Sequence, residues 1–157
     1  MGSNLGDARK NLHEAGMRID SLEGVCITAS SAIWQTEPQD LKDQPWFANQ
    51  VLQLRCDSKW TPEGLLAALL EIEQCMGRSR GIRFGPRCID LDLLLFGDRI
   101  ITSGDLILPH PRMRKRAFVL IPLREVAGNL IFPEGDTLDQ ALACLRFLTM
   151  DNRICQE

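Results

Sequence analysis

Two aspartates separated by one residue, Asp90 and Asp92, are the strongest chemical signal in the sequence. In a β-strand the side chains at i and i+2 share a face, so both carboxylates lie side by side while Leu91 and Leu93 face away. Adjacent carboxylates in an apolar stretch repel each other and lose hydration, and a divalent cation relieves both costs. Mg²⁺ prefers one or two carboxylates together with water and phosphate oxygens. The pair predicts a magnesium site; the alternative is a solvent-facing pair bonded to neighbouring arginines.

A cluster of arginines and glycines stands immediately before the aspartate pair. It comprises Arg78, Arg80, Gly81, Arg83, Gly85 and Arg87. A guanidinium group binds phosphate with planar two-point geometry, and a glycine lets the backbone approach a ligand closely. Alone, such a stretch is typical of a solvated basic loop. Beside paired carboxylates it matches the electrostatic needs of phosphoryl transfer.

A second basic stretch, residues 112–116, follows His110. Beside these cations the imidazole could donate a hydrogen bond to phosphate, and a purely structural role is equally open. The net charge is only −3, yet residues 78–124 hold ten Lys or Arg and four Asp, a balance of +6. The rest of the chain has a balance of −9. Concentrated positive charge attracts anions without identifying them.

The segment of residues 36–49 combines aromatic and amide side chains at its far end, namely Gln44, Trp46, Phe47 and Asn49. An aromatic ring beside an amide could stack on a flat heterocycle and hydrogen-bond to its edge. Where a strand begins, however, Trp46 and Phe47 are more typical of core residues.

Apolar periodicity and turn residues predict the elements that position these groups. Helices are expected over residues 7–22, 61–76, 118–127 and 138–148. Strands are expected over residues 25–34, 48–55 and 88–96, and Gly97-Asp98 would turn the last into a partner at residues 99–102. Residues 36–45 and 78–86 are predicted loops. This order indicates an α+β fold in which helices cover one face of an antiparallel sheet.

Length and composition exclude several classes of protein. The 157 residues suit one domain, residues 1–157, at a usual domain size of about 100–150 residues. With 45% hydrophobic and 25% charged residues the chain is not a disordered one. No apolar run approaches the roughly 18–20 residues that cross a bilayer, and no secretory signal opens the chain, which predicts a cytoplasmic protein. The six cysteines form no Cys-x-x-Cys pair, which disfavours a zinc ribbon.

The sequence resembles the 6-hydroxymethyl-7,8-dihydropterin pyrophosphokinase family of the folate pathway. Four motifs carry the resemblance, in the family's order: GSNLG at 2–6, DQPWFAN at 43–49, RFGPRCIDLDLL at 83–94 and LPHP at 108–111. The family implies a ferredoxin-like core and transfer of diphosphate from ATP to the hydroxymethyl group of a reduced pterin, releasing AMP. It also implies two Mg²⁺ ions, and a monomer that acts on small molecules with no nucleic-acid or membrane partner.

The resemblance further implies roles for individual residues. Asp90 and Asp92 match the metal ligands, and with Arg80 and Arg87 they form the expected catalytic set. The expected nucleotide contacts are Glu73, near the ribose, and Arg78, Phe84, His110 and Arg116. The expected pterin contacts are Thr36, Phe47, Asn49 and Phe118, with Asn49 reading the ring edge and the two phenylalanines stacking on the ring.

The chain departs from the family at three places. Phe84 stands where many members have Trp, and Asp40 where members commonly have Gly. Members also have a short apolar strand ahead of Gly-Ser-Asn, between the strands expected here at 48–55 and 88–96, and Met1 occupies its last position. Because unpaired strand edges inside a sheet are costly, we expect about six to eight further apolar residues ahead of Gly2.

Two other functions are compatible with the residues alone. A ferredoxin-like module that binds anions or nucleic acid would explain the basic charge, although it would not require paired strand carboxylates. A different Mg-NTP-dependent transferase acting on another hydroxyl group would explain both features.

Overall fold

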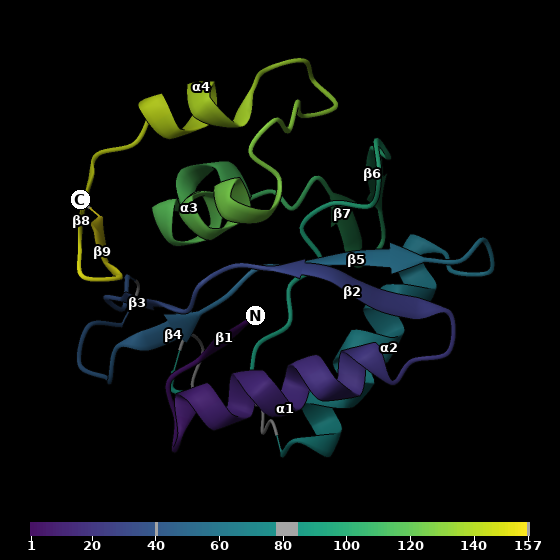
Figure 1. The fold of residues 1–157 in the computed structure, drawn as a ribbon, viewed down its shortest axis with the longest axis horizontal. Helices are drawn as coiled ribbons and strands as arrows, with labels where there is room; N and C mark the ends of the chain where they lie inside the picture. Colours follow the sequence, from purple (N-terminus) through teal and green to yellow (C-terminus); the bar gives the residue numbers. More distant parts are fainter. Residues whose placement is uncertain (40, 78–84, 157) are drawn as a thin grey trace.

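Two helices form where the sequence predicts them in the computed structural model, which describes residues 1–39, 41–77 and 85–156 (Figure 1). Helix α1 (Ala8–Asp20) begins after Asp7, whose carboxylate accepts the Lys10 N–H at 3.0 Å. Helix α2 (Pro62–Cys75) begins after Thr61, whose hydroxyl accepts the Gly64 N–H at 3.1 Å. Both caps satisfy amides that a helix start leaves without a partner, which is why short polar residues mark these boundaries.

The two long strands expected at 25–34 and 48–55 are each broken into two. They become β2 (Val25–Ser30) and β3 (Trp34–Thr36), then β4 (Phe47–Asn49) and β5 (Leu52–Cys56). At the break the Ser31 hydroxyl accepts the Val51 N–H at 3.0 Å and donates to the Ala32 carbonyl at 2.8 Å. A serine that bonds to nearby backbone offers the chain an alternative to the ladder. One hairpin therefore contributes to two sheets, β2 with β5 and β3 with β4.

The short strand β1 (Gly2–Ser3) lies where a first ferredoxin-like strand is expected, beside β4 and the residues around Asp90. Gly2 pairs with Asn49 and exchanges two backbone hydrogen bonds with Asp90, of 2.9 and 2.8 Å. The strand predicted over 88–96 is wrong. Within this range only Asp90 pairs, through an isolated bridge with Gly2. The Leu91 N–H donates instead to the Glu73 carboxylate, and the Leu94 carbonyl accepts the His110 N–H.

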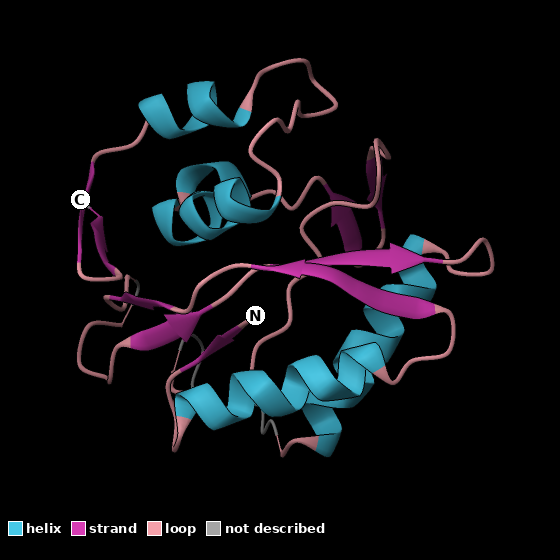
Figure 2. Cartoon of the chain, viewed as in Figure 1, coloured by secondary structure: helices cyan, strands magenta, loops and turns pink. Residues whose placement is uncertain are grey.

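Helices cover both sides of the strands rather than one, which corrects the expected one-sided arrangement (Figure 2). Helices α1 and α2 share a core with Ala48, Ile89 and Leu91. Helix α3 (Ala117–Val126), preceded by a 3₁₀ turn (Met113–Lys115), and helix α4 (Leu138–Ala143) build a second core on the other side. Val51 is buried in this second core, with Leu94 and Leu95 packed against it, so apolar side chains from the strand region serve both layers.

Two hairpins differ from the sequence expectations. Residues 99–102 do not pair with 88–96; β6 (Ile101–Ser103) pairs instead with β7 (Leu106–Leu108). The helix expected over 138–148 ends at Ala143 and is followed by β8 (Phe147–Met150) and β9 (Arg153–Gln156). Asp151 and Asn152 have φ values of 48° and 59°, the left-handed conformation of a two-residue hairpin turn.

The C-terminal hairpin extends the main sheet to the order β1-β4-β3-β9-β8. Strand β9 runs parallel to β3, whereas the other strand pairs are antiparallel. This pairing places Ile154 of β9 beside Thr36. None of the described helices is long and apolar enough to cross a membrane.

Candidate active site

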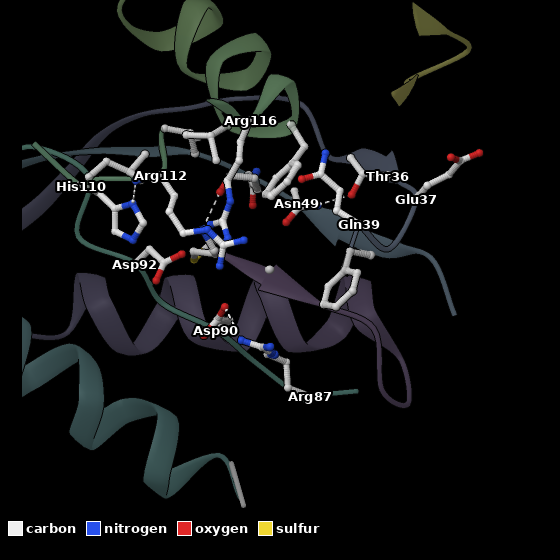
Figure 3. Close-up of a pocket in the computed structure, with 18 of the residues that line it drawn as sticks. Thr36, Glu37, Gln39, Asn49, Arg87, Asp90, Asp92, His110, Arg112 and Arg116 are labelled. Atoms are coloured by element: carbon white, nitrogen blue, oxygen red, sulfur yellow. Dashed lines mark hydrogen bonds and ion pairs between the residues drawn. The ribbon is translucent and has the colours of Figure 1, made fainter. Parts of the chain in front are cut away.

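A cavity of about 260 Å³ opens between β1, β4, the start of α3 and the segment that carries the two aspartates (Figure 3). It collects most of the residues that the sequence assigned to a site. They are Thr36, Phe47, Asn49, Arg87, Asp90, Asp92, His110, Arg116 and Phe118. Arg78, Arg80 and Phe84 lie outside the described residues, so their predicted roles stay predictions.

Asp90 and Asp92 both line this cavity, while Leu91 between them is 4% exposed and packs into the α1–α2 core. The i, i+2 alternation therefore survives without a regular strand, because the buried Leu91 anchors the segment. Asp90 forms an ion pair with Arg87, with 2.8 Å between Oδ2 and Nη1. Side-chain exposures of 21% for Arg87 and 24% for Asp90 place the pair partly out of water, where such a contact is stronger than on an open surface.

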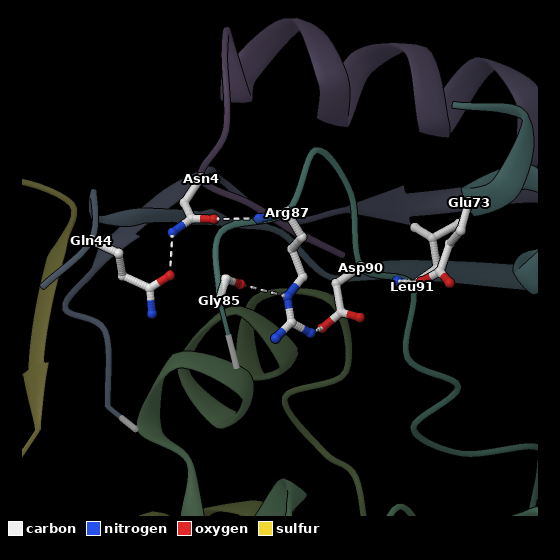
Figure 4. A network of polar contacts seen from close by, with 7 residues as sticks. All are labelled: Asn4, Gln44, Glu73, Gly85, Arg87, Asp90 and Leu91. Atoms are coloured by element: carbon white, nitrogen blue, oxygen red, sulfur yellow. Dashed lines mark hydrogen bonds and ion pairs between the residues drawn. The ribbon is translucent and has the colours of Figure 1, made fainter. Parts of the chain in front are cut away.

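Asn4 holds the segment with Arg87 against the loop on the opposite side (Figure 4). Its Oδ1 accepts the Arg87 N–H at 2.9 Å, and its Nδ2 donates to the Gln44 Oε1 and the Pro45 carbonyl, both at 3.0 Å. Asn4 is 4% exposed, so these bonds form away from water. The GSN motif therefore joins the two walls of the cavity through one amide.

His110 lines the cavity with its ring partly buried, and this burial lowers the pKa of His110 below its usual value. The nearby Asp92 carboxylate opposes that shift, and the Arg116 and Arg112 cations reinforce it. The His110 Nδ1 accepts the Arg112 N–H at 3.2 Å. In the neutral ring the proton therefore lies on Nε2, which makes that nitrogen a hydrogen-bond donor suited to a phosphate oxygen.

The other end of the cavity has an amide held in a fixed orientation. Asn49 Nδ2 donates to the Thr36 hydroxyl at 2.6 Å across the β3–β4 pair, and Thr36 is buried. A Cβ atom at Gly2 would lie 2.7 Å from Asn49 Oδ1, closer than such contacts occur, so any larger residue there would push this amide out of its present position. The arrangement presents Asn49 to a ligand as a preset donor and acceptor.

Aromatic rings border the same end. Phe47 and Phe118 both line the cavity, and the Arg116 guanidinium lies over the Phe118 ring, 5.3 Å from its centroid. The core interpretation of Trp46 is wrong: it is 37% exposed, with the Arg153 guanidinium 5.6 Å from its ring. This guanidinium comes from the C-terminal hairpin, a neighbour that the sequence around Trp46 does not predict.

The structure does not bring Glu73 into the cavity. Glu73 is 2% exposed, and its carboxylate accepts the Leu91 N–H between the two aspartates (Figure 4). This contact fixes the backbone of the aspartate segment from the side of α2. The predicted ribose contact remains a prediction.

Several residues that line the cavity were not predicted, among them Glu37, Gln39, Gln50 and Arg112. Arg112 stands in the basic stretch that the sequence did single out, directly after the LPHP motif. Glu37 and Gln39 belong to a polar loop whose sequence carries no further signal.

A model of the family described as 7,8-dihydro-6-hydroxymethylpterin-pyrophosphokinase matches residues 1–128. The chain belongs to this family. The resemblance that rested on four sequence motifs is thereby confirmed, and the match includes the residues that line the cavity up to Val119.

Relatives of the pyrophosphokinase family differ in length. The chain is 41% identical over 145 residues to a 2-amino-4-hydroxy-6-hydroxymethyldihydropteridine pyrophosphokinase of Methylorubrum extorquens, covering 92% of this chain and 90% of that protein. It is 40% identical over 147 residues to the protein of the same name in Pseudomonas aeruginosa, covering 94% and 90%. It is also 41% identical over 138 residues to a mitochondrial folate synthesis bifunctional protein of Arabidopsis thaliana, covering 88% of this chain but only 24% of that protein.

Proposed function

We propose that the chain transfers the β,γ-diphosphate of ATP to the hydroxymethyl group of 6-hydroxymethyl-7,8-dihydropterin, giving the pterin diphosphate and AMP in folate biosynthesis. One observation carries the proposal. A single cavity holds Asp90 and Asp92 at one end and Asn49 with Phe47 and Phe118 at the other. A carboxylate pair suits a metal-bound triphosphate, and an amide together with aromatic rings suits a flat heterocycle.

The acidic end fits Mg²⁺. The described residues contain no group of three or more His, Cys, Asp or Glu that could hold a metal without further ligands. Mg²⁺ sites at nucleotides are typically built from one or two carboxylates plus phosphate oxygens and water. We propose that Asp90 and Asp92 hold two Mg²⁺ ions, which when bound would offset the negative charge of the triphosphate.

The reaction then depends on placing one hydroxyl group in line with ATP. The hydroxymethyl oxygen forms a bond to the β-phosphorus and loses its proton to water, and the bond from that phosphorus to the α,β-bridging oxygen breaks, so that AMP leaves with that oxygen. Arg87 and Arg116 bind phosphate oxygens, and His110 donates from Nε2. Asn49 and the two phenylalanines fix the ring, so that the hydroxyl group meets the phosphorus at a productive distance.

Calorimetric titration with a non-hydrolysable ATP analogue and with 6-hydroxymethylpterin, with and without Mg²⁺, tests this function. We expect the analogue to bind with Mg²⁺ and to lose at least about tenfold in affinity when the metal is removed, because the carboxylates then face the phosphates unscreened. We expect the pterin to bind to the complex. If the analogue binds and the pterin does not, the chain is another NTP-dependent transferase. If neither ligand binds, an enzyme of this class is contradicted.

Replacing Gly2 with alanine should weaken pterin binding by about tenfold, because the new Cβ displaces the Asn49 amide and leaves a polar edge unpaired. Pterin affinity can be measured by fluorescence titration in the presence of the ATP analogue. Affinity for the analogue should change by less than about twofold, since the backbone bonds of Gly2 to Asp90 are retained.

Gly16→Ala provides the matched control. Gly16 lies in α1, and a Cβ there meets no heavy atom within 4 Å. Alanine also favours the helix by about 1 kcal/mol over glycine. Normal pterin affinity in Gly2→Ala, or a loss of equal size in Gly16→Ala, would show that Gly2 does not hold Asn49 in place.

A further inference from the structure

The C-terminal strand β9 ends beside the proposed pterin end of the cavity. Its residues pair in parallel with β3, Arg153 with Gln35 and Ile154 with Thr36. Ile154 is buried, and the Asn152 carbonyl accepts the Gln35 N–H at 2.8 Å. The strand is thus attached to the element that carries Thr36, and the residues after Ile154 extend towards the start of α3.

Gln156, on this strand, makes contacts with the start of α3. Its Oε1 accepts the N–H of Ala117, the first residue of α3, at 2.7 Å, and its Nε2 donates to the Lys115 carbonyl at 2.8 Å. The helix has no side-chain cap of its own, since Arg116 at the N-cap position makes no capping hydrogen bond. The Gln156 amide therefore fills the place of a cap from a distant part of the sequence.

The residues fixed by this amide flank two cavity residues. Lys115 and Ala117 enclose Arg116, and Phe118 follows directly. Arg116 and Phe118 both line the cavity, and the cation–π contact joins them. A rotation of the backbone at 115–117 would move both side chains, because Arg116 lies within this segment and Phe118 follows it directly.

Gln156 also contacts the loop on the other side. Its Oε1 accepts a second hydrogen bond, from the Gln39 Nε2 at 3.0 Å. Gln39 lines the cavity with Thr36 and Glu37, and a second cavity of about 340 Å³, lined by the same loop, Phe118 and Gln156, adjoins it. A carbonyl oxygen has two lone pairs, so one amide can join the loop and the helix start at the same time.

We infer that Gln156 is a positioning residue for the pterin end of the site, holding Phe118 and Arg116 in register with the loop of Thr36 and Gln39. The inference rests on the proposed function. It assigns a role to the C-terminal hairpin, which lies beyond the residues 1–128 that the family model matches.

Titration of the 157-residue chain with 6-hydroxymethylpterin, in the presence of Mg²⁺ and the ATP analogue, tests this role. Gln156→Ala should weaken pterin binding by about tenfold and binding of the analogue by less, because the ring loses its fixed partner while the aspartate segment is untouched. Gln156→Glu should recover part of the loss, since a carboxylate still accepts from Ala117 and Gln39 but cannot donate to Lys115. Gln39→Ala should add little to Gln156→Ala, because the two residues share one contact.

Gln140→Ala is the matched control. Gln140 closes the capping box of α4 by accepting the Thr137 N–H at 2.8 Å, and it does not line the cavity. Its loss should lower the melting temperature while pterin affinity stays normal. Hydrogen exchange at the Ala117 amide, which should accelerate in Gln156→Ala and not in Gln140→Ala, reports the cap without any ligand.

The outcomes separate the two proposals. Suppose that the wild-type chain binds the pterin. If Gln156→Ala then binds it with the same affinity, or if Gln140→Ala loses as much pterin affinity as Gln156→Ala, the positioning role is overturned and the proposed function stands. Failure of the wild-type chain to bind pterin would overturn both.

Discussion

Replacing either Asp90 or Asp92 with asparagine should lower kcat by at least about a thousandfold while the protein still folds, a loss of roughly 4 kcal/mol in transition-state stabilisation. Both carboxylates line the same cavity, and in the proposed function their charge would hold Mg²⁺ beside the triphosphate. Asparagine keeps the shape of the side chain and removes the charge. Steady-state turnover with Mg-ATP and the reduced pterin measures the effect, and circular dichroism confirms folding.

Asp98→Asn is the matched control for the aspartates. Asp98 is exposed in the turn after the same segment and does not line the cavity. Near-normal turnover of a folded Asp90→Asn or Asp92→Asn protein would remove the metal assignment. A comparable loss in Asp98→Asn would mean that any change of charge in this region disturbs activity.

Replacing Arg87 with alanine should lower kcat/KM for ATP by about a hundredfold or more, and should weaken binding of the ATP analogue much less. The backbone of Arg87 stays fixed because Asn4 bonds to its N–H, so the change removes only the guanidinium group. The guanidinium's ion pair with Asp90 is lost with it. Lysine should restore activity only in part, because a point charge cannot make a two-point contact with phosphate.

Arg99→Ala separates a specific contact from the general basic charge of residues 78–124. Arg99 is exposed and lies outside the cavity, so its loss removes one positive charge and no phosphate contact. Full activity of Arg87→Lys, or an equal loss in Arg99→Ala, would argue for a nonspecific basic surface.

Local signals in the sequence predicted the elements whose boundaries depend on neighbouring residues. Thr61, Pro62 and Glu63 marked the start of α2 because a cap, a fixed φ and the helix dipole act within one turn. The i, i+2 spacing of Asp90 and Asp92 placed both carboxylates in one cavity. That result did not need the regular strand that was predicted there, since a buried Leu91 gives the same alternation.

Contacts between distant residues account for what the sequence did not predict. The break between β2 and β3 depends on Ser31 bonding to Val51, twenty residues away. The single bridge at Asp90 depends on Glu73 and His110 taking the neighbouring backbone groups. Neither partner can be read from the local pattern, because each interaction forms only when the fold brings the residues together.

The C-terminal hairpin depends most clearly on contacts between distant residues. The apolar residues Leu145, Phe147 and Leu148 continued a helical pattern, and the turn at Asp151-Asn152 carried the only opposing local signal. Pairing with β3 decided the outcome, and it also placed Gln156 at α3. A site residue supplied in this way has no motif of its own.

Product analysis is the most direct test of a diphosphate transfer. The 157-residue chain is incubated with Mg-ATP and 6-hydroxymethyl-7,8-dihydropterin, and phosphorus NMR follows the products, with a parallel reaction lacking the pterin. A pterin pyrophosphokinase yields AMP and pterin diphosphate in equal amounts, and neither forms without the pterin or without Mg²⁺. Formation of ADP with a pterin monophosphate, or release of phosphate from ATP at the same rate with and without the pterin, would contradict the proposed activity.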